Sequence, residues 1–484
     1  MNGLSFNSAK TTIMPVTFGG RLSHSDPPSV FLDGQEIKVV HSMRYLGVLW
    51  DSFLTFNEHF KIVKKKVDIL TCQMNSVAHR FFSKRLNLFR KIYVAAIEPY
   101  ILFGHGAWGH RLNLIQIKNN LLSIQRRPLL KITGAFRTSP SVALPVIAGL
   151  LPLDLKAVEV HSLFLIKNCK EEVKIGPTSF SPSEFEVKIN LTNIHPASRL
   201  SIPFSIRDPK TEPLAIFTDG SGIDDKIGVA FVVFYHGTEI HSQTARLPDT
   251  CSVFQAEVLG IKLALEFCSD IQHIRDIHIY SDSRAALQSL ADPSNHNSVV
   301  NKAKQAFLNV IGHLDIKLHW IKAHVGYQGN ERADQLAKEA TLRSSPDIIL
   351  PKPTSSLKRN IRLQLQDQWQ DKWFMSTKGR QTYNYIPQVG LKIKTEIPQV
   401  VHFLTDHGRF QYYFFRFGLS TTSSCSCGAT GKADHYILHC PLNSDLSRKL
   451  VYDPDHPSTI LENKSNQSII KQIVDRVDSS ILRV

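Results

Sequence analysis

Four acidic residues in the middle of the chain could hold a metal ion if the fold brings them together. They are Asp219 in "FTDGS", Glu257 in "QAEVLG", Asp282 in "IYSDS" and Asp334 in "NERADQ". Taken singly, each has an ordinary explanation, because Asp beside Gly is common in turns and carboxylates favour helix N-termini. Gathered at one rim, however, the carboxylates would repel and raise one another's pKa. A hard divalent cation removes that penalty, and oxygen ligands suit Mg²⁺ or Mn²⁺.

Such a carboxylate cluster predicts hydrolysis of a phosphodiester. A pair of metal ions about 4 Å apart activates a water for in-line attack and stabilises the leaving 3′-oxygen. His324 begins the glycine-bearing loop "HVGYQGNERAD", ten residues before Asp334. Because histidine titrates near neutrality, His324 is a candidate proton carrier beside the metal site. The alternative is a surface histidine with no role.

Alternating strand and helix patterns supply the elements that must position these residues. Strands are expected at 214–218, 228–237, 238–248, 276–283 and 316–324, and helices at 252–270, 283–290, 299–314 and 330–342. The order βββαβαβα predicts an α/β fold with a mixed five-stranded sheet and flanking helices. Asp219 and Asp282 are expected at strand ends, where α/β sheets gather their sites. Glu257 and Asp334 are expected in the first turns of helices.

These blocks also resemble type 1 ribonuclease H. "FTDGS", "QAEVLGIKLAL", "IYSDSRAAL" and "HVGYQGNERADQLAKEA" look like that family's signature blocks, in order and at normal spacing. The resemblance implies a ribonuclease H-like fold that cleaves the RNA strand of an RNA–DNA hybrid and leaves 5′-phosphate and 3′-hydroxyl ends. It implies that Asp219, Glu257, Asp282 and Asp334 hold two Mg²⁺ ions, and that His324 assists product release or proton transfer. No small-molecule cofactor is expected.

One departure from that family concerns substrate binding. Between Leu290 and the strand at 316–324 there is room for a loop and one helix only. The additional basic helix with which some cellular members grip the hybrid has no counterpart here. Binding of the hybrid is therefore expected to depend on the flanking regions.

The N-terminal flank has a resemblance of its own. "RYLGVLWDSFLTFNEHF" and "LLSIQRRPLLKITGAFRTSPSVALPVIAGLLPLDL" resemble the palm end and thumb-side region of a reverse transcriptase from arthropod-type non-LTR retrotransposons. The aromatic-Ala-Asp-Asp motif of such polymerases does not occur in this sequence. No DNA synthesis is therefore expected from this chain.

The C-terminal flank contains a cluster of cysteine and histidine. "CSCGATGKADHYILHC" places Cys425, Cys427, His435 and Cys440 in a C-x-C-x7-H-x4-C array. Thiolates and imidazole at this spacing suit a structural Zn²⁺ ion, and the pattern resembles the Cys/His motif that follows the ribonuclease H domain in such retrotransposons. His439 is a competing ligand, and a reduced, metal-free cluster is the alternative.

The chain as a whole is predicted to contain four segments. They are a truncated palm-end and thumb-like region at 1–170, a Pro/Ser-rich linker at 171–210, a ribonuclease H domain at 211–343 and a helical Cys/His-containing tail at 344–484. The net charge of +15 favours a polyanionic partner. No apolar run is long enough for a transmembrane helix, so no membrane partner is expected. The odd number of cysteines, seven, favours a reducing intracellular compartment.

The leading hypothesis is an active ribonuclease for RNA–DNA hybrids within a retrotransposon polyprotein fragment. One alternative is a catalytically inactive nucleic-acid-binding remnant of such an element. Another is a different nuclease of the same fold, such as a resolvase or integrase, although the loop at His324 and the position of Asp334 disfavour it. The sequence does not specify the oligomeric state.

Overall fold

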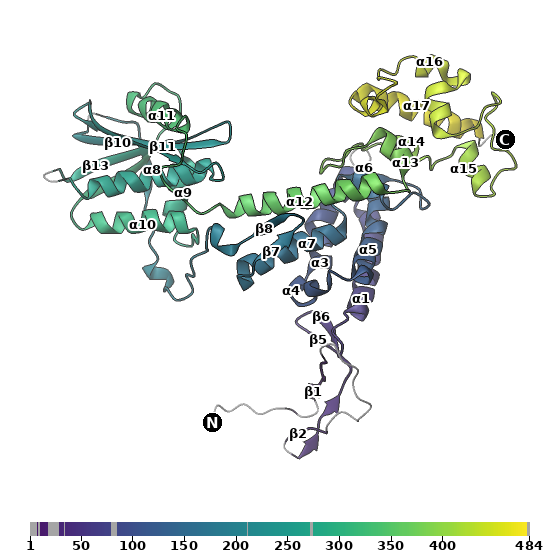
Figure 1. Ribbon diagram of the computed structural model, residues 1–484, viewed down its shortest axis with the longest axis horizontal. Helices are drawn as coiled ribbons and strands as arrows, with labels where there is room; N and C mark the ends of the chain where they lie inside the picture. The colour runs from purple at the N-terminus through teal and green to yellow at the C-terminus, as the bar shows by residue number, and fades with distance from the viewer. Residues whose placement is uncertain are drawn as a thin grey trace. The chain divides into compact units, whose positions relative to one another are not determined.

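The computed structural model describes residues 7, 10–17, 29–32, 34–78, 85–210, 212–271 and 274–481. The chain forms two compact units, shown in Figure 1. One consists of Met1–Phe164 together with Arg362–Val484, and the other of Leu165–Ile361. The second unit is called the sheet unit below, and the first the helical unit.

The sheet unit contains one mixed six-stranded sheet with the strand order β12-β11-β10-β13-β14-β9. Strands β10, β11 and β12 pair antiparallel, whereas β10, β13, β14 and β9 pair parallel. The strands are β9 (Phe204–Ile206), β10 (Leu214–Ile223), β11 (Lys226–Tyr235), β12 (Thr238–Leu247), β13 (Asp276–Ser281) and β14 (Asp315–Trp320). The expected mixed α/β sheet is therefore present, with one strand more than the five predicted.

Helices cover both faces of this sheet, as Figure 1 shows. They are α8 (Val253–Cys268), α9 (Arg284–Ala291), α10 (Ser298–Ile311) and α11 (Gln328–Thr341). Helices α8, α9 and α10 bury one apolar cluster against the strands, and α11 buries a second cluster on the opposite face. Helix α8 begins at Val253, close to the start predicted at residue 252. Its N-terminus is stabilised by a reciprocal capping box between Ser252 and Gln255.

The sixth strand corrects the prediction of a linker at 171–210. Strand β9 comes from that segment and pairs with β14, and β7 (Val173–Ile175) and β8 (Thr178–Phe180) form a hairpin in it. In the same segment, the backbone amide of Glu186 donates a hydrogen bond to the Lys352 carbonyl at 2.9 Å. Short strands among Pro and Ser residues carry no periodicity, so their pairing is invisible in the sequence. The predicted domain start at residue 211 lies outside the described residues.

Strand β9 is joined to the sheet through a buried pair of histidines. Ser205 Oγ lies 2.7 Å from His319 Nδ1, and His319 Nε2 lies 2.8 Å from His278 Nδ1. Both rings are 3% exposed and stack at a centroid distance of 5.0 Å. Burial, and then the neighbouring His278, lower the pKa of His319 to about 4. His319 therefore stays neutral while the sheet is folded at neutral pH.

Acid is expected to destabilise the sheet unit through His319. Because the folded pKa lies below the ordinary value of 6.5, the unfolded chain binds more protons between these two values, and stability is lost as pH falls through that window. The loss attributable to His319 is at most about 3 kcal/mol. Hydrogen exchange of the β13 and β14 peptides, compared between wild type and His319→Gln, measures it. If the two proteins lost protection equally at acid pH, His319 would not be the cause of the acid destabilisation.

The helical unit is built from both ends of the chain. Its N-terminal part contains β1 (Thr12–Ile13), β2 (Phe31–Leu32), β3 (Gln35–Glu36), β4 (Lys38–Val39), β5 (Ser42–Tyr45), β6 (Val48–Asp51), α1 (Asn57–Ala78), α2 (Arg85–Ile92), α3 (Glu98–Leu102), α4 (His105–Trp108), α5 (Ile115–Thr133), α6 (Ala143–Ala148) and α7 (Leu153–Phe164). Its C-terminal part contains α12 (Thr354–Met375) from residue 362 on, α13 (Arg380–Tyr385), α14 (Pro398–Thr405), α15 (Gln411–Arg416), α16 (Ser444–Ser447) and α17 (Lys464–Ile481).

Partly buried polar contacts join these two parts. The Arg90 guanidinium donates to the Gly149 carbonyl at 3.1 Å and to the Leu391 carbonyl at 2.9 Å. Arg362 donates to Glu159, which is 1% exposed. The predicted boundary at 343/344 therefore differs from the observed division, because the tail beyond 361 packs with the N-terminal segment. Among the described residues, no helix has both the length and the hydrophobicity needed to cross a bilayer.

Candidate active site

Three of the predicted acidic residues meet at one point of the sheet unit. Asp219 lies on β10, Asp282 directly follows β13, and Glu257 lies on α8. Their carboxylate oxygens lie within 4.8 Å of one another. The parallel register explains the meeting of the two aspartates, because Thr218 is paired with Ser281 and each aspartate is the next residue.

The structure revises the local setting of Asp219 and Glu257. Strand β10 continues to Ile223, so Asp219 lies within the strand and not at its end. The chain turns at Asp224 and Asp225, whose φ values are 48° and 60°. Helix α8 begins at Val253, which places Glu257 in the second turn. The predicted end of the strand at residue 218 was wrong, because β10 pairs with β11 along its whole length.

Gly220 allows the strand and helix to approach closely. A Cβ atom on Gly220 would lie 2.7 Å from the backbone nitrogen of Glu257 and 3.0 Å from Ala256. Neither Gly220 nor Gly222 has a positive φ. The absence of a side chain at Gly220, and not its freedom to turn, therefore brings Asp219 and Glu257 together.

A single methyl group at Gly220 is expected to separate the carboxylates. Gly220→Ala forces α8 away from β10, because the clash is with backbone, and it should lower the free energy of unfolding by about 1–3 kcal/mol. Because the carboxylates move apart, it is also expected to weaken the binding of a divalent cation such as Mg²⁺. Thermal unfolding with and without Mg²⁺ measures both effects.

Gly222→Ala is the matched control for this experiment. A Cβ atom there meets the Val253 side chain at 2.8 Å, and that side chain is 41% exposed and can shift. If Gly222→Ala lowered the free energy of unfolding and the effect of Mg²⁺ as much as Gly220→Ala, the role assigned to Gly220 would be contradicted.

The electrostatics of the cluster favour a bound cation. Asp219 and Glu257 are 6% and 7% exposed. Burial, together with nearby Asp282 and Asp334, raises the pKa of Asp219 to about 7. Burial, and then the charges of Asp219 and Asp282, raise the pKa of Glu257 well above its ordinary value. Glu257 Oε2 has no hydrogen-bond partner in the described part of the chain. An all-oxygen site with an unpaired buried carboxylate atom fits a hard divalent cation.

The two remaining predicted residues are not members of this close group. Asp334 is on α11, outside the close group, and its Oδ2 accepts from Lys338 Nζ at 2.7 Å. Helix α11 begins at Gln328, so Asp334 is in its second turn. His324 is an exposed residue of the loop after β14, with φ of 55°. The participation of Asp334 and His324 remains a prediction.

Sequence reasoning missed Asn330 beside this site. Its side-chain amide donates to Asp282 Oδ2 at 3.2 Å, and the residue is 1% exposed. Asn330 lies four residues before Asp334 on the same helix, which places both on one face. The spacing of four residues from Asp334 was the signal in the sequence by which Asn330 could have been assigned to the site.

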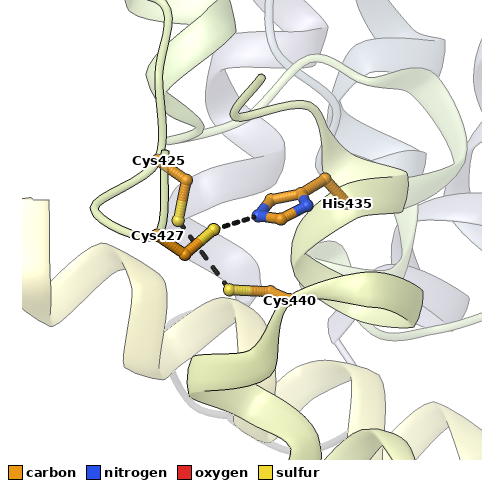
Figure 2. A group of neighbouring side chains, drawn as sticks. All are labelled: Cys425, Cys427, His435 and Cys440. Atoms are coloured by element: carbon orange, nitrogen blue, oxygen red, sulfur yellow. Dashed lines mark hydrogen bonds between the residues drawn. The ribbon is translucent and has the colours of Figure 1, made fainter. Parts of the chain in front are cut away.

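The Cys/His array of the helical unit also comes together. Figure 2 shows the four side chains pointing toward a common centre. The ligand atoms of Cys425, Cys427, His435 and Cys440 lie within 4.8 Å of one another. The Sγ atoms of Cys425 and Cys440 are 3.8 Å apart, and Cys427 Sγ is 3.1 Å from His435 Nε2. Sulfurs bound tetrahedrally to zinc at about 2.3 Å lie about 3.8 Å apart, so the thiols fit that metal.

Comparison with known families identifies the sheet unit. Residues 211–342 match the family model described as RNase H. This segment is an RNase H domain, and the chain therefore carries a ribonuclease H enzyme domain, as the sequence predicted.

The curated relatives are proteins of R1 retrotransposons. A 115 kDa protein of the type-1 retrotransposable element R1DM of Drosophila melanogaster is 31% identical over 157 residues, covering 32% of this chain and 15% of that protein. The retrovirus-related Pol polyprotein from type-1 retrotransposable element R1 of Bradysia coprophila is 35% identical over 97 residues, covering 19% of this chain and 10% of its own length. The chain thus spans only a small part of these relatives.

Solved structures similar to this chain include two proteins that are each 21% identical to it. RNase H1 of the archaeon Halobacterium salinarum has a TM-score of 0.23, covering 26% of this chain and 96% of that one. The foamy viral protease-reverse transcriptase in complex with dsDNA has a TM-score of 0.24, covering 28% of this chain and 99% of that one.

Proposed function

We propose that the RNase H domain hydrolyses the RNA strand of an RNA–DNA hybrid with two bound Mg²⁺ or Mn²⁺ ions. The observation that carries this proposal is the buried cluster of Asp219, Glu257 and Asp282 with its unpaired Glu257 oxygen. Bound divalent ions would activate water and stabilise the leaving oxygen. The three carboxylates would hold the ions, and Asp334 would join them on release from Lys338. His324 would carry a proton to or from the reacting groups.

The Cys/His cluster is proposed to hold a structural Zn²⁺ ion. Cys425, Cys427, His435 and Cys440 would fill a closed tetrahedral site, which leaves no position for catalysis. Because such a site needs reduced thiols, we place the protein in a reducing intracellular compartment. We also propose that the protein belongs to a retrotransposon polyprotein.

A nuclease assay tests the proposed activity. The protein is incubated with a labelled RNA–DNA hybrid, duplex DNA or single-stranded RNA, with Mg²⁺ or with a chelator. Cleavage is expected only of the RNA in the hybrid, only with metal, and with 5′-phosphate products. Cleavage of duplex DNA would favour a different nuclease of the same fold.

One observation favours the alternative of an inactive nucleic-acid-binding remnant. The Lys338–Asp334 ion pair occupies a carboxylate that the proposal assigns to the metal site. Lys338→Gln frees Asp334 while leaving the α11 backbone unchanged. An intact RNA strand with wild type, but a cleaved one with Lys338→Gln, would support the inactive alternative. Intact RNA with both proteins would refute the proposed activity.

A further inference from the structure

A short segment that precedes the RNase H match is built into the sheet that carries the acidic cluster. Residues 204–210, called the strap below, lie outside the segment 211–342 that matches the family. Their strand β9 pairs in parallel with β14, and the register places Ile206 opposite Trp320. Ile202, just upstream, is 1% exposed and belongs to the apolar cluster that α8, α9 and α10 bury. The strap is therefore a fixed part of the sheet.

The strap supports one residue of the acidic cluster through Trp320. The Arg207 amide donates to the Trp320 carbonyl at 3.4 Å, which continues the pairing of β9 with β14. Trp320 Nε1 in turn donates to the backbone carbonyl of Asp282 at 2.9 Å. Because β13 ends at Ser281, this bond holds the backbone of Asp282 beyond the strand. The strap thus contacts the residue that holds a carboxylate of the close group.

The strap holds a second element of the site through Tyr327. The Tyr327 hydroxyl donates to the carboxylate of Asp208 in the strap. Tyr327 directly precedes α11 and packs against the apolar cluster beneath that helix. Its side chain makes no capping bond to α11, so the hydroxyl binds the strap and not the helix. Helix α11 carries Asp334 and also Asn330, which donates to Asp282.

The loop between β14 and α11 needs a support of this kind. His324 and Gly326 in this loop have φ values of 55° and 91°. A non-glycine residue in the left-handed region is strained and persists only where the surrounding structure holds it. His324 and Val325 are exposed and so contribute little packing. The anchor of Tyr327 at the end of the loop therefore limits the positions that His324 can take.

The strap holds Asp208 in place independently of Tyr327. Glu212, which is 6% exposed, accepts from the Lys210 amide at 3.1 and 2.9 Å and from the Arg207 guanidinium at 3.1 Å. These bonds bend the strap around a buried carboxylate, with Asp208 inside the bend. Asp208 is therefore fixed as an acceptor before Tyr327 binds it, which is how a supporting residue must be built.

We infer that the strap positions the ribonuclease site through the Asp208–Tyr327 hydrogen bond and through Trp320. These three are positioning residues, because each acts through another residue and none is placed on the substrate. Partners that orient metal ligands are typically worth about 10- to 100-fold in metal affinity or activity. The inference rests on the proposed function, since it assigns the strap a role in that reaction. Hybrid cleavage by this chain then depends on residues outside the segment 211–342.

Removing one hydroxyl group from the full-length protein tests the inference. Tyr327→Phe keeps the packed ring and deletes only the donor to Asp208. Its single-turnover cleavage rate at saturating hybrid and Mg²⁺ is expected to fall about tenfold, whereas the hybrid concentration at half-saturation should stay within about twofold of wild type. A changed half-saturation at an unchanged maximal rate would place Tyr327 in substrate binding and overturn the inference. So would a variant that matches wild type in both.

Two substitutions of Asp208 separate the hydrogen bond from the charge. The Asn oxygen still accepts from the Tyr327 hydroxyl, so Asp208→Asn should keep its rate within about threefold of wild type, whereas Asp208→Ala should lose about tenfold. An Asp208→Asn protein as slow as Asp208→Ala would assign the effect to charge and contradict the inference. Tyr327→Phe combined with Asp208→Ala should lose no more than either alone, because both remove one contact. A loss equal to the product of the two would show that they act separately.

Tyr235→Phe is the matched control for the loss of a hydroxyl group. Tyr235 is 41% exposed and pairs with Leu214, at the opposite end of β10 from the acidic cluster. The cleavage rate of this variant should equal that of wild type. If it also fell about tenfold, the loss in Tyr327→Phe would not report the strap, and the inference would fail.

Hydrogen exchange separates this inference from the proposed function. Peptides covering residues 322–334 should exchange faster in Tyr327→Phe and in Asp208→Ala than in wild type, whether or not the hybrid is cleaved. Equal exchange in all three proteins would overturn the inference, even for an active enzyme. Faster exchange in the variants, with no cleavage by wild type, would support the hold of the strap and refute the proposed function alone.

Discussion

Replacing Asp219 by Asn is expected to lower hydrolysis of an RNA–DNA hybrid by about three orders of magnitude or more. The amide removes a negative charge from the centre of the cluster, where the carboxylates of Glu257 and Asp282 lie within 4.8 Å. Loss of charge weakens both metal binding and the positioning of the ions. Single-turnover cleavage rates at saturating Mg²⁺ measure the effect.

The same substitution is expected to stabilise the metal-free protein. Burial and neighbouring carboxylates raise the folded pKa of Asp219 from 3.8 to about 7. Between these values the folded state binds more protons than the unfolded state, so stability falls as pH rises through this window. Above it, the ionised Asp219 destabilises the fold by an amount on the order of a few kcal/mol. Asp219→Asn has no such loss and should be the more stable protein above neutral pH.

Chemical unfolding in a chelator, at acid pH and above neutrality, checks this prediction. Asp276→Asn is the matched control, because that carboxylate is half-exposed and pairs with Lys317 at 2.8 Å. Addition of Mg²⁺ should close the gap between wild type and Asp219→Asn. A wild type that is equally stable at all pH values without metal would show that the carboxylates do not repel in the folded state.

Asp219→Asn is thus expected to lower activity but to raise the stability of the metal-free protein. Only part of the structural basis for these two effects can be predicted from the sequence. The meeting of Asp219 and Asp282 could be predicted from the sequence, because each follows a short apolar run and neighbouring parallel strands bring such positions together, although β10 continues past Asp219 to Ile223. The contribution of Gly220 could not be predicted from the sequence. Its short distance to the Glu257 backbone exists only once the helix is packed on the strand.

The features that were missed depend on contacts between distant parts of the chain. Strand β9 has three residues, and only its pairing with β14 identifies it. Asp154 and Lys372 meet across 218 residues of sequence, so their ion pair leaves no local pattern. By contrast, the Cys/His array is compact in sequence, and its residues meet as their spacing indicated.

Loss of the Cys/His site is expected to unfold the C-terminal part of the helical unit. Zinc binding to structural sites is worth about 10–16 kcal/mol at neutral pH, which exceeds the stability of most domains. Cys440→Ser removes a thiolate from a buried position, because Cys440 is 2% exposed. The variant should lose bound zinc and show rapid hydrogen exchange between residues 411 and 447. Elemental analysis and exchange mass spectrometry measure both.

Cys72→Ser is the control for this substitution, because Cys72 is an exposed free cysteine of the same unit. It should leave zinc content and exchange unchanged. A strong chelator should reproduce the effect of Cys440→Ser in wild type. A tail that keeps its slow exchange without metal would contradict a structural zinc ion.

The effect should reach beyond the tail itself. The η7 turn, His435–His439, carries a proposed ligand and contacts α17, which in turn packs on α14. Helix α14 lies against the N-terminal part, where the ring of His402 contacts Phe136 at a centroid distance of 4.8 Å. Loss of zinc should therefore increase exchange around residue 136 as well. Because that contact lies within the helical unit, hybrid cleavage by the RNase H domain should decline less than zinc content does.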